Sequence, residues 1–282
     1  MKIVESIHEM RDITERARIE GKIIGFVPTM GCLHEGHLSL MRKAREEVDL
    51  LVTSIFVNPA QFGQGEDYDR YPRDIDKDIR KASELEANIT FHPGNEDIYP
   101  DNYHTFVTVG KITNKLCGVS RPGFFRGVAT VVTKLFNIVR PHKAYFGEKD
   151  YQQLVVIRKM VKDLNMDIKI IGIPIIRESN GLAMSSRNLY LTDKERVSAI
   201  SLSRSLNRAK EMVDSGERSA ERIISEMKSI IESERFTEID YITVCDPEEF
   251  EDVDKIKERA LIALAVRIGK ARLIDNCVVE VK

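Results

Sequence analysis

The sequence predicts an α/β protein with a Rossmann-like, doubly wound parallel sheet and a smaller C-terminal α+β domain. Up to about residue 173, short runs rich in Val, Ile and Phe alternate with segments of helical periodicity. This alternation is typical of parallel strands covered by helices on both faces. After about residue 176, two long helical segments precede several strand-like runs. We therefore expect two domains, residues 1–176 and 177–282.

Five apolar runs are the predicted strands of the first domain. They show little polar alternation, so both faces of each strand should be buried. In such sheets ligands bind beyond the carboxyl ends of the strands, where the connecting loops meet. The predicted strands are residues 23–27, 50–57, 88–91, 144–147 and 168–173.

Helices are predicted between these strands and at the start of the second domain. Val128, Val131 and Leu135 recur at helical spacing and form one apolar face, and residues 154–164 repeat the pattern. In the second domain, Thr192 and the Glu three positions later have the spacing of a capping box, which opens a helix. Further segments are a helix over 220–231 and strands over 240–244, 260–266 and 271–281.

Composition excludes several classes of function. Of the 282 residues, 42% are hydrophobic and 31% are charged, and 43 Lys+Arg against 45 Asp+Glu give a net charge of -2. This balance provides no overall field for nucleic acid or an anionic membrane. No apolar run approaches the ~18 residues of a membrane span, and the N-terminus lacks a signal-peptide core. We expect neither nucleic acid nor a membrane as a partner.

The four cysteines indicate a cytoplasmic protein with reduced thiols. They are far apart in the chain and form no C-x-x-C pair. This spacing favours neither a disulfide framework nor a zinc ribbon.

The stretch "PTMGCLHEGH" places His34 and His37 directly after a predicted strand, around Gly36. A helix N-terminus favours anions, and imidazole can donate protons or hydrogen bonds near neutral pH. Two alternatives are a zinc site that includes Cys32 and simple capping of the helix by both rings. The zinc site lacks the usual spacing and a fourth ligand. The strand–glycine–helix setting favours a phosphate site over capping alone.

Two further motifs offer cations and hydroxyl groups. Lys149 in "FGEKD" is placed where a strand ends, and "GLAMSSRNLYL" sets Ser185 and Ser186 before Arg187. Hydroxyl groups beside a guanidinium suit terminal phosphates. Taken alone, each motif is more typical of an ordinary solvated turn, and only the other motifs counted with it favour a phosphate site.

The segment "FVNPAQF" and the loop after it supply uncharged polar groups. Asn58 and Gln61 follow a predicted strand, where their amides suit a hydroxyl or carboxylate substrate. The glycine-containing loop after them, which includes Gly63 and Gly65, could act as a mobile lid, or it could be a plain solvent loop. Beyond it, the acidic residues Asp74, Asp76 and Asp78 are spread around a helix, so we predict a solvated first turn rather than a metal cluster.

Five motifs together, in this order, resemble the pantoate–β-alanine ligase family. They are "PTMGCLHEGH", "SIFVNPAQF", "RPGFFRGV", "YFGEKDYQQL" and "GLAMSSRNLYLT". The histidine pair is similar to the HIGH motif of the nucleotidylyltransferase superfamily, and "MSSR" is similar to its KMSKS counterpart. The resemblance implies that ATP adenylates the carboxylate of (R)-pantoate with release of pyrophosphate. The amine of β-alanine then attacks the adenylate, which gives pantothenate and AMP.

The resemblance also implies site residues and partners. His37 is the expected proton donor, His34 should share the phosphate charge, Lys149 should bridge phosphates, and Arg187 should close over pyrophosphate. Mg²⁺ should arrive with ATP and not on a protein metal site, the second domain should close over the nucleotide, and the protein should be a cytoplasmic homodimer. The expected ATP-binding residues are Met30, Gly31, Cys32, Leu33, His34, Glu35, Gly36, His37, Gly147, Glu148, Lys149, Asp150, Ile176, Met184, Ser185, Ser186 and Arg187. The expected pantoate and β-alanine residues are Gln61, Gln153 and Asn58.

One departure and two alternatives remain open. Phe124 stands where many relatives have histidine, so no role is assigned to it. The chain could instead be another HIGH-type nucleotidylyltransferase, although Gln61 and Gln153 offer amides where such an enzyme would want additional cations. It could also be a non-catalytic nucleotide-binding module, although its near-neutral charge argues against one that binds RNA.

Overall fold

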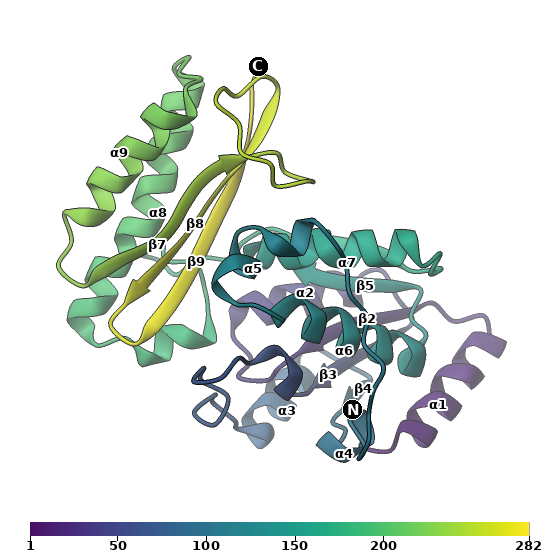
Figure 1. The fold of residues 1–282 in the computed structure, drawn as a ribbon. Coiled ribbons are helices and arrows are strands. Elements are labelled where there is room, and N and C mark those ends of the chain that lie inside the picture. Colours follow the sequence, from purple (N-terminus) through teal and green to yellow (C-terminus); the bar gives the residue numbers. More distant parts are fainter. Residues whose placement is uncertain (282) are drawn as a thin grey trace. The chain divides into compact units, whose positions relative to one another are not determined.

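The computed structural model describes residues 1–281, which fold into two compact units (Figure 1). Each unit has its own sheet and its own hydrophobic core. The first unit comprises Met1–Thr113, Arg121–Glu148 and Gln152–Pro174, and the second comprises Asn114–Ser120, Lys149–Tyr151 and the chain from Ile175 onward. The division into domains 1–176 and 177–282 stays a prediction.

The first unit is built on a six-stranded parallel sheet in the order β1-β4-β3-β2-β5-β6. The chain leaves β2 toward β3 on one side and later returns to β5 on the other side. The order of the strands therefore reverses between β2 and β5, which is where doubly wound sheets bind ligands. The strands are β1 (Lys2–Val4), β2 (Ile24–Thr29), β3 (Leu50–Ile55), β4 (Ile89–Phe91), β5 (Lys143–Gly147) and β6 (Lys169–Ile173).

Helices cover both faces of this sheet, as the apolar runs predicted. Successive side chains of a strand point to opposite faces, so Phe26 of β2 joins one buried cluster and Val27 joins another. The helices of this unit are α1 (Ile7–Ile19), α2 (Glu35–Arg45), α3 (Ile75–Glu84), α4 (Asn95–Ile98), α6 (Phe124–Val139) and α7 (Tyr151–Asp163), with the short 3-10 turns η1 (Pro59–Gln61) and η2 (Ile112–Asn114). The 3-10 turn η3 (Glu148–Asp150) lies where the chain passes from the first unit to the second, after Glu148.

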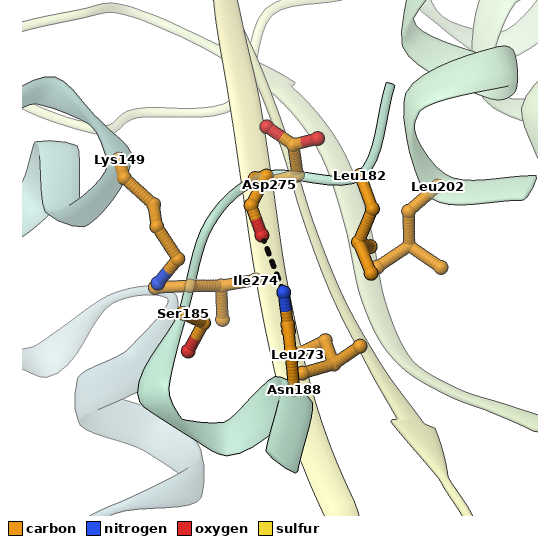
Figure 2. Close-up of a pocket in the computed structure, with 9 residues that line it drawn as sticks. Lys149, Leu182, Ser185, Asn188, Leu202, Leu273, Ile274 and Asp275 are labelled. Carbon is orange, nitrogen blue, oxygen red and sulfur yellow. Dashed lines mark hydrogen bonds between the residues drawn. The ribbon is translucent and has the colours of Figure 1, made fainter. Parts of the chain in front are cut away.

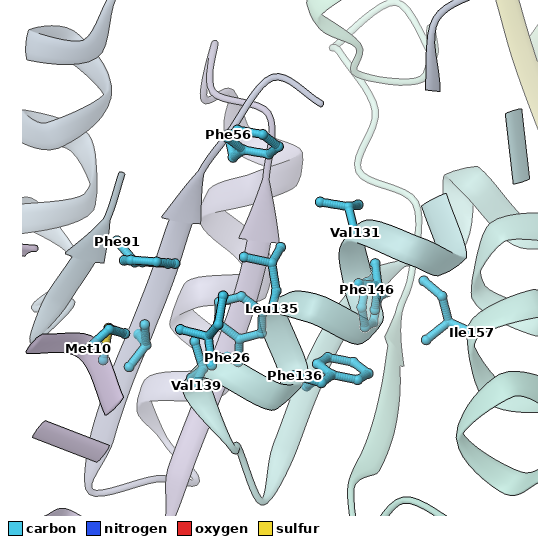
Figure 3. Packing of buried hydrophobic residues seen from close by; sticks show 14 of the residues in the cluster. Met10, Phe26, Phe56, Phe91, Val131, Leu135, Phe136, Val139, Phe146 and Ile157 are labelled. Carbon is cyan, nitrogen blue, oxygen red and sulfur yellow. The ribbon is translucent and has the colours of Figure 1, made fainter. Parts of the chain in front are cut away.

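The larger core of the first unit lies between the sheet and helices α1, α6 and α7 (Figure 3). Phe136 of α6 packs edge-to-face on Phe26 of β2 and on Phe146 of β5, with ring centroids 6.3 and 6.4 Å apart. Edge-to-face pairs of this kind add specificity to apolar burial. This contact ties α6 to the two strands that flank the reversal in strand order.

The second unit has a three-stranded antiparallel sheet in the order β7-β8-β9. Two helices pack on it around a separate core. Helix α8 begins with the expected capping box, in which Thr192 and Glu195 satisfy each other's backbone N–H groups. The elements are α5 (Cys117–Ser120), the 3-10 turn η4 (Ser186–Tyr190), α8 (Asp193–Asp214), α9 (Ala220–Glu232), β7 (Thr237–Cys245), β8 (Arg259–Ile268) and β9 (Ala271–Glu280).

The structure confirms the predicted fold class and adds one strand. Strand β1 pairs with β4 at the edge of the sheet and buries only Val4 of its three residues, so it lacks the apolar run that marked β4. Among residues 1–281, none of the helices has both the length and the apolar character needed to cross a membrane. None of the four cysteines forms a disulfide in this part of the chain.

Candidate active site

The turn that joins β2 to α2 has an unusual backbone, held by a carboxylate from another helix. Gly31 and Cys32 have φ angles of 78° and 50°, in the left-handed region that non-glycine residues avoid. Oδ2 of Asp78 accepts a hydrogen bond from the Cys32 N–H, and Oδ1 accepts one from the Leu33 N–H, both at 2.7 Å. A Cβ atom on Gly31 would lie 2.8 Å from Oδ2 of Asp78, so this position requires glycine.

The prediction of a solvated acidic turn is wrong for Asp78. Asp74 caps helix α3 and is exposed, as is Asp76, whereas Asp78 is only 2% exposed. Burial raises the pKa of the Asp78 carboxyl, and the hydrogen bonds from Leu33 and Cys32 offset that rise only in part. The first turn of α3 packs against the β2–α2 turn, a tertiary contact that spacing along the helix could not reveal.

The two histidines form the cap of α2. Nδ1 of His34 accepts a hydrogen bond from the Gly36 N–H at 3.2 Å, and Nδ1 of His37 accepts one from the His34 N–H at 3.4 Å. Their ring centroids are 4.1 Å apart, with an interplanar angle of 33°. Because each Nδ1 is an acceptor, each neutral ring carries its proton on Nε2. The cap uses the Nδ1 atoms, so capping and a chemical role for Nε2 are compatible.

The amides predicted to hold substrate follow strand β3. Asn58 and Gln61 are 1% and 8% exposed, at the two ends of the short turn η1. Nδ2 of Asn58 donates to Oε1 of Gln61 at 3.0 Å and to the Gly127 carbonyl at 3.1 Å. This contact leaves Nε2 of Gln61 directed at Sδ of Met30, 2.8 Å away. A thioether is a weak acceptor, so a substrate oxygen could replace it at little cost.

The geometry makes Asn58 an orienting group for Gln61. Both N–H groups of its amide are engaged by protein acceptors, and its Oδ1 accepts from the Ala60 N–H at 3.2 Å. Direct contact of Asn58 with substrate stays a prediction.

The motif "RPGFFRGV" packs against the turn that carries this amide pair, a role that the sequence did not reveal. Helix α6 approaches η1 at Gly127, where a Cβ atom would lie 2.1 Å from the Ala60 carbonyl oxygen and 2.8 Å from Cα of Gln61. Only glycine permits this approach. The glycine itself is visible in the motif, but nothing in the sequence indicated which segment would pack against the helix at Gly127.

Arg121 in the same motif fastens the glycine-containing loop. Its Nε and Nη2 atoms each donate to a carboxylate oxygen of Glu66 at 2.6 Å, and Nη2 also donates to the Gln61 carbonyl at 3.1 Å. The Phe124 ring lies under the guanidinium, 3.8 Å from its centroid, within the range of a cation–π contact. Phe124, which received no role from the sequence, therefore supports Arg121.

The strand on the other side of the reversal, β5, ends at Gly147. Gly147 and Glu148 belong to the first unit, as does Gln153 on α7. The neighbouring Gln152 is buried and donates to the Ile112 carbonyl at 2.8 Å, so it has a structural role. Gln153 is half-buried, and its contact with pantoate stays a prediction.

In the second unit, Lys149 and Ser185 line one small hollow (Figure 2). The backbone carbonyl of Lys149 accepts a hydrogen bond from Nδ2 of Asn276 at 2.9 Å, which ties this residue to β9. Its Nζ lies 3.8 Å from Oδ1 of Asp150, a loose ion pair. In Figure 2 the Lys149 side chain and Ser185 reach into the hollow, so an ammonium and a hydroxyl line the same recess.

Turn η4 carries Ser186 and Arg187, and hydrogen bonds of Ser185 and Asn188 hold it in place. Oγ of Ser185 caps it by accepting from the Arg187 N–H at 3.3 Å. Asn188, which is 4% exposed, donates to the Ala183 carbonyl at 3.1 Å (the dashed line in Figure 2) and to Glu178 at 2.8 Å. These buried contacts hold the backbone of the motif.

Two residues predicted to meet the nucleotide, Ile176 and Met184, are joined directly. The Met184 N–H donates to the Ile176 carbonyl at 2.9 Å, at the base of a short turn. Arg177 beside it makes two hydrogen bonds to the buried Asp275 carboxylate, at 2.6 and 3.0 Å. The turn is thus fixed to strand β9.

The predicted site residues therefore form two groups. The first unit holds residues 30–37, Asn58, Gln61, Gly147, Glu148 and Gln153, and the second holds Lys149, Asp150, Ile176 and residues 184–187. Convergence of the two groups on one ligand stays a prediction. Among residues 1–281, no three His, Cys, Asp or Glu side chains gather in a way that could hold a metal ion.

Comparison with known proteins decides the family. The family model described as pantoate-beta-alanine ligase matches residues 2–278. The chain belongs to the pantoate-beta-alanine ligase family. Its relatives are enzymes, so the sequence-based assignment to a ligase family is confirmed.

Relatives of this family match the chain over its whole length. Pantothenate synthetase of Caldicellulosiruptor saccharolyticus is 55% identical over 281 residues, which is 100% of both chains. The crystal structure of pantothenate synthetase from Thermus thermophilus has a TM-score of 0.94 at 42% identity, covering 98% of this chain and 99% of that one. A pantoate-beta-alanine ligase from Francisella tularensis, complexed with beta-gamma ATP and beta-alanine, has a TM-score of 0.82 at 38% identity, covering 98% and 97%.

The contact between α6 and η1 gives a direct test. We expect Gly127→Ala to destabilise the protein by ~1–3 kcal/mol, because a methyl group there overlaps the Ala60 carbonyl. The free energy of unfolding would be measured by urea denaturation. Gly110→Ala is the matched control, since nothing lies within 4 Å of a Cβ at that position. Equal stability of the two variants would contradict the close approach.

Proposed function

We propose that this chain condenses (R)-pantoate with β-alanine at the expense of ATP, through a pantoyl-adenylate intermediate. Membership of the ligase family supports the overall reaction. The observation that carries the stepwise proposal is the histidine pair at the start of α2, whose Nδ1 atoms are held by backbone N–H groups. That pair follows β2, at the reversal in strand order, where a nucleotide would be expected.

In the first step, a carboxylate oxygen of pantoate attacks the α-phosphorus of ATP. The bond from that phosphorus to the bridging oxygen breaks, and pyrophosphate leaves with the electron pair. Negative charge grows on the bridging and terminal oxygens, so hydrogen-bond donors that are already in place lower the barrier. We assign the Nε2–H groups of His34 and His37, the Lys149 ammonium and the Arg187 guanidinium to these oxygens.

In the second step, the amine of β-alanine attacks the acyl carbon of the adenylate. AMP leaves with the electrons of the acyl–oxygen bond, and the amine loses a proton as the amide forms. The protein need supply no nucleophile; it must position the reactants and exclude water, which would hydrolyse the adenylate. The Gln61 amide, oriented by Asn58, is assigned to the pantoate oxygens and to contact with β-alanine, with Gln153 as its predicted partner.

The remaining parts of the proposal rest on resemblance to the family. Mg²⁺ would enter bound to the ATP phosphates and neutralise part of their charge. Residues 177–282 would close over the nucleotide as a domain and bring residues 184–187 to the pyrophosphate. The protein would act as a homodimer in the cytoplasm.

Pyrophosphate exchange tests the intermediate directly. We expect the purified chain, with Mg²⁺ and pantoate, to move labelled pyrophosphate into ATP without β-alanine. Adenylation is reversible and does not need β-alanine, so its reverse reaction incorporates the label. Omission of pantoate is the control. A folded protein that forms pantothenate from all three substrates yet exchanges no label would contradict the adenylate while leaving the ligase assignment standing.

The tautomer assigned to His37 gives a second test. In His37→Asn, the amide oxygen can take the place of Nδ1 as acceptor, so the helix cap and the melting temperature should be preserved. The Nε2–H donor is lost, and exchange should fall by about 100-fold or more. His37→Gln is the matched variant, since its longer amide reaches the Nε2 position and should retain more exchange. If exchange fell in His37→Gln but not in His37→Asn, the acceptor at the Nδ1 position alone would matter, and the ring would serve only as a cap.

A further inference from the structure

The loop of residues 30–37 differs from a phosphate loop that binds through its backbone, because the N–H groups of residues 31–34, 36 and 37 donate to acceptors within the protein. The Gly31 N–H donates to Oγ1 of Thr29 at 3.2 Å. The next two, of Cys32 and Leu33, donate to Asp78. Those of His34, Gly36 and His37 are engaged within the cap itself, with His37 Nδ1, His34 Nδ1 and the His34 carbonyl as acceptors.

Helix α3 holds this turn at two points. The Asp78 carboxylate accepts the two consecutive N–H groups, and Nζ of Lys81 donates to the Leu33 carbonyl. Lys81 is three residues after Asp78, so both side chains lie on the same face of the helix. The two peptide groups that flank Leu33 are therefore both held: an anion accepts from the Leu33 N–H, and a cation donates to the Leu33 carbonyl.

We infer that Asp78, assisted by Lys81, is the positioning residue of the nucleotide-binding loop. It turns the Cys32 and Leu33 N–H groups away from the ligand and sets the direction in which the chain enters the His34 cap. ATP phosphates then meet the imidazole Nε2–H groups instead of this stretch of backbone. This inference rests on the proposed role of the histidine pair in binding ATP.

A carboxylate is the group that this contact requires. Two N–H groups point at its two oxygens, and each oxygen accepts one. An amide of the same shape has a single oxygen, so its NH₂ group would face one of the backbone N–H groups, donor against donor. A buried donor without an acceptor is unfavourable, and the turn would have to rotate.

The test compares Asp78→Asn with Asp74→Ala. Asp74 caps the same helix through its bond to the Lys77 N–H at 3.1 Å and is exposed, so its removal weakens α3 without changing the acceptors of the loop. Both variants would be studied as the full chain, at a temperature where circular dichroism shows them folded. The readouts are the dissociation constant and stoichiometry of a non-hydrolysable ATP analogue by calorimetry, and the kcat and KM values of pyrophosphate exchange.

We expect Asp78→Asn to bind the analogue about 10-fold more weakly at unchanged stoichiometry and to lose about 100-fold in exchange kcat, with the KM for pantoate little changed. Asp74→Ala should match the wild type in all of these. A purely structural role would lower the stoichiometry and leave the dissociation constant unchanged. That result, or equal losses in the two variants, would overturn the inference.

Two further outcomes keep the test decisive. If wild-type protein exchanges no pyrophosphate, the adenylate fails as a proposal, and the calorimetric comparison decides the role of Asp78 alone. If Asp78→Asn does not fold, Lys81→Met replaces it, because it removes the other hold on Leu33. Weaker binding of the analogue by Lys81→Met at unchanged stoichiometry would support the inference, and wild-type binding would overturn it.

Discussion

The first unit depends most on a contact between one buried carboxylate and two backbone amides. Residues 31 and 32 adopt left-handed φ angles, and for Cys32 that conformation is unfavourable by roughly 1–2 kcal/mol without compensation. Asp78 supplies the compensation through two 2.7 Å hydrogen bonds. Burial raises the pKa of the Asp78 carboxyl, whereas the two hydrogen bonds lower it. The unfavourable burial of the carboxylate and its favourable bonds to the turn therefore oppose each other. Such local strain persists only where the surrounding structure determines it, and it is common at functional sites.

From this contact the geometry of the histidine pair follows. Once the turn is fixed, the chain enters α2 with His34 as the N-cap, and the two Nδ1 atoms take backbone N–H groups. Capping and chemistry, which look like alternatives in the sequence, use different atoms of the same rings. The amide pair after β3 is built on the same principle. The Asn58 amide donates to Gln61 and so orients it, and it also donates to the Gly127 carbonyl. Because Gly127 has no side chain, helix α6 can pack closely against η1 at this point.

How much the sequence predicts depends on whether a feature is local. The buried strands could be predicted because runs of Val, Ile and Phe report burial on both faces, and the Thr192 cap could be predicted because its partner lies three residues away. Strand β1 exposes two of its three residues, so it shows no apolar run of the kind that marked β4, which is equally short. Asp78 looked solvated because an acidic first turn usually is; its partners are 46 and 45 residues away. Arg121 and Gly127 likewise contact segments that are 55 to 69 residues away in the chain, which no spacing rule connects to them.

The central claim is that the Cys32 and Leu33 amides serve Asp78 and not the nucleotide. Amide hydrogen exchange at these two residues, followed by NMR with and without a non-hydrolysable ATP analogue, tests this most directly. We expect both amides to be protected in the ligand-free protein and the analogue to change their protection little. Amides that exchange freely without nucleotide and become protected when it binds would be phosphate donors, and the central claim would be wrong.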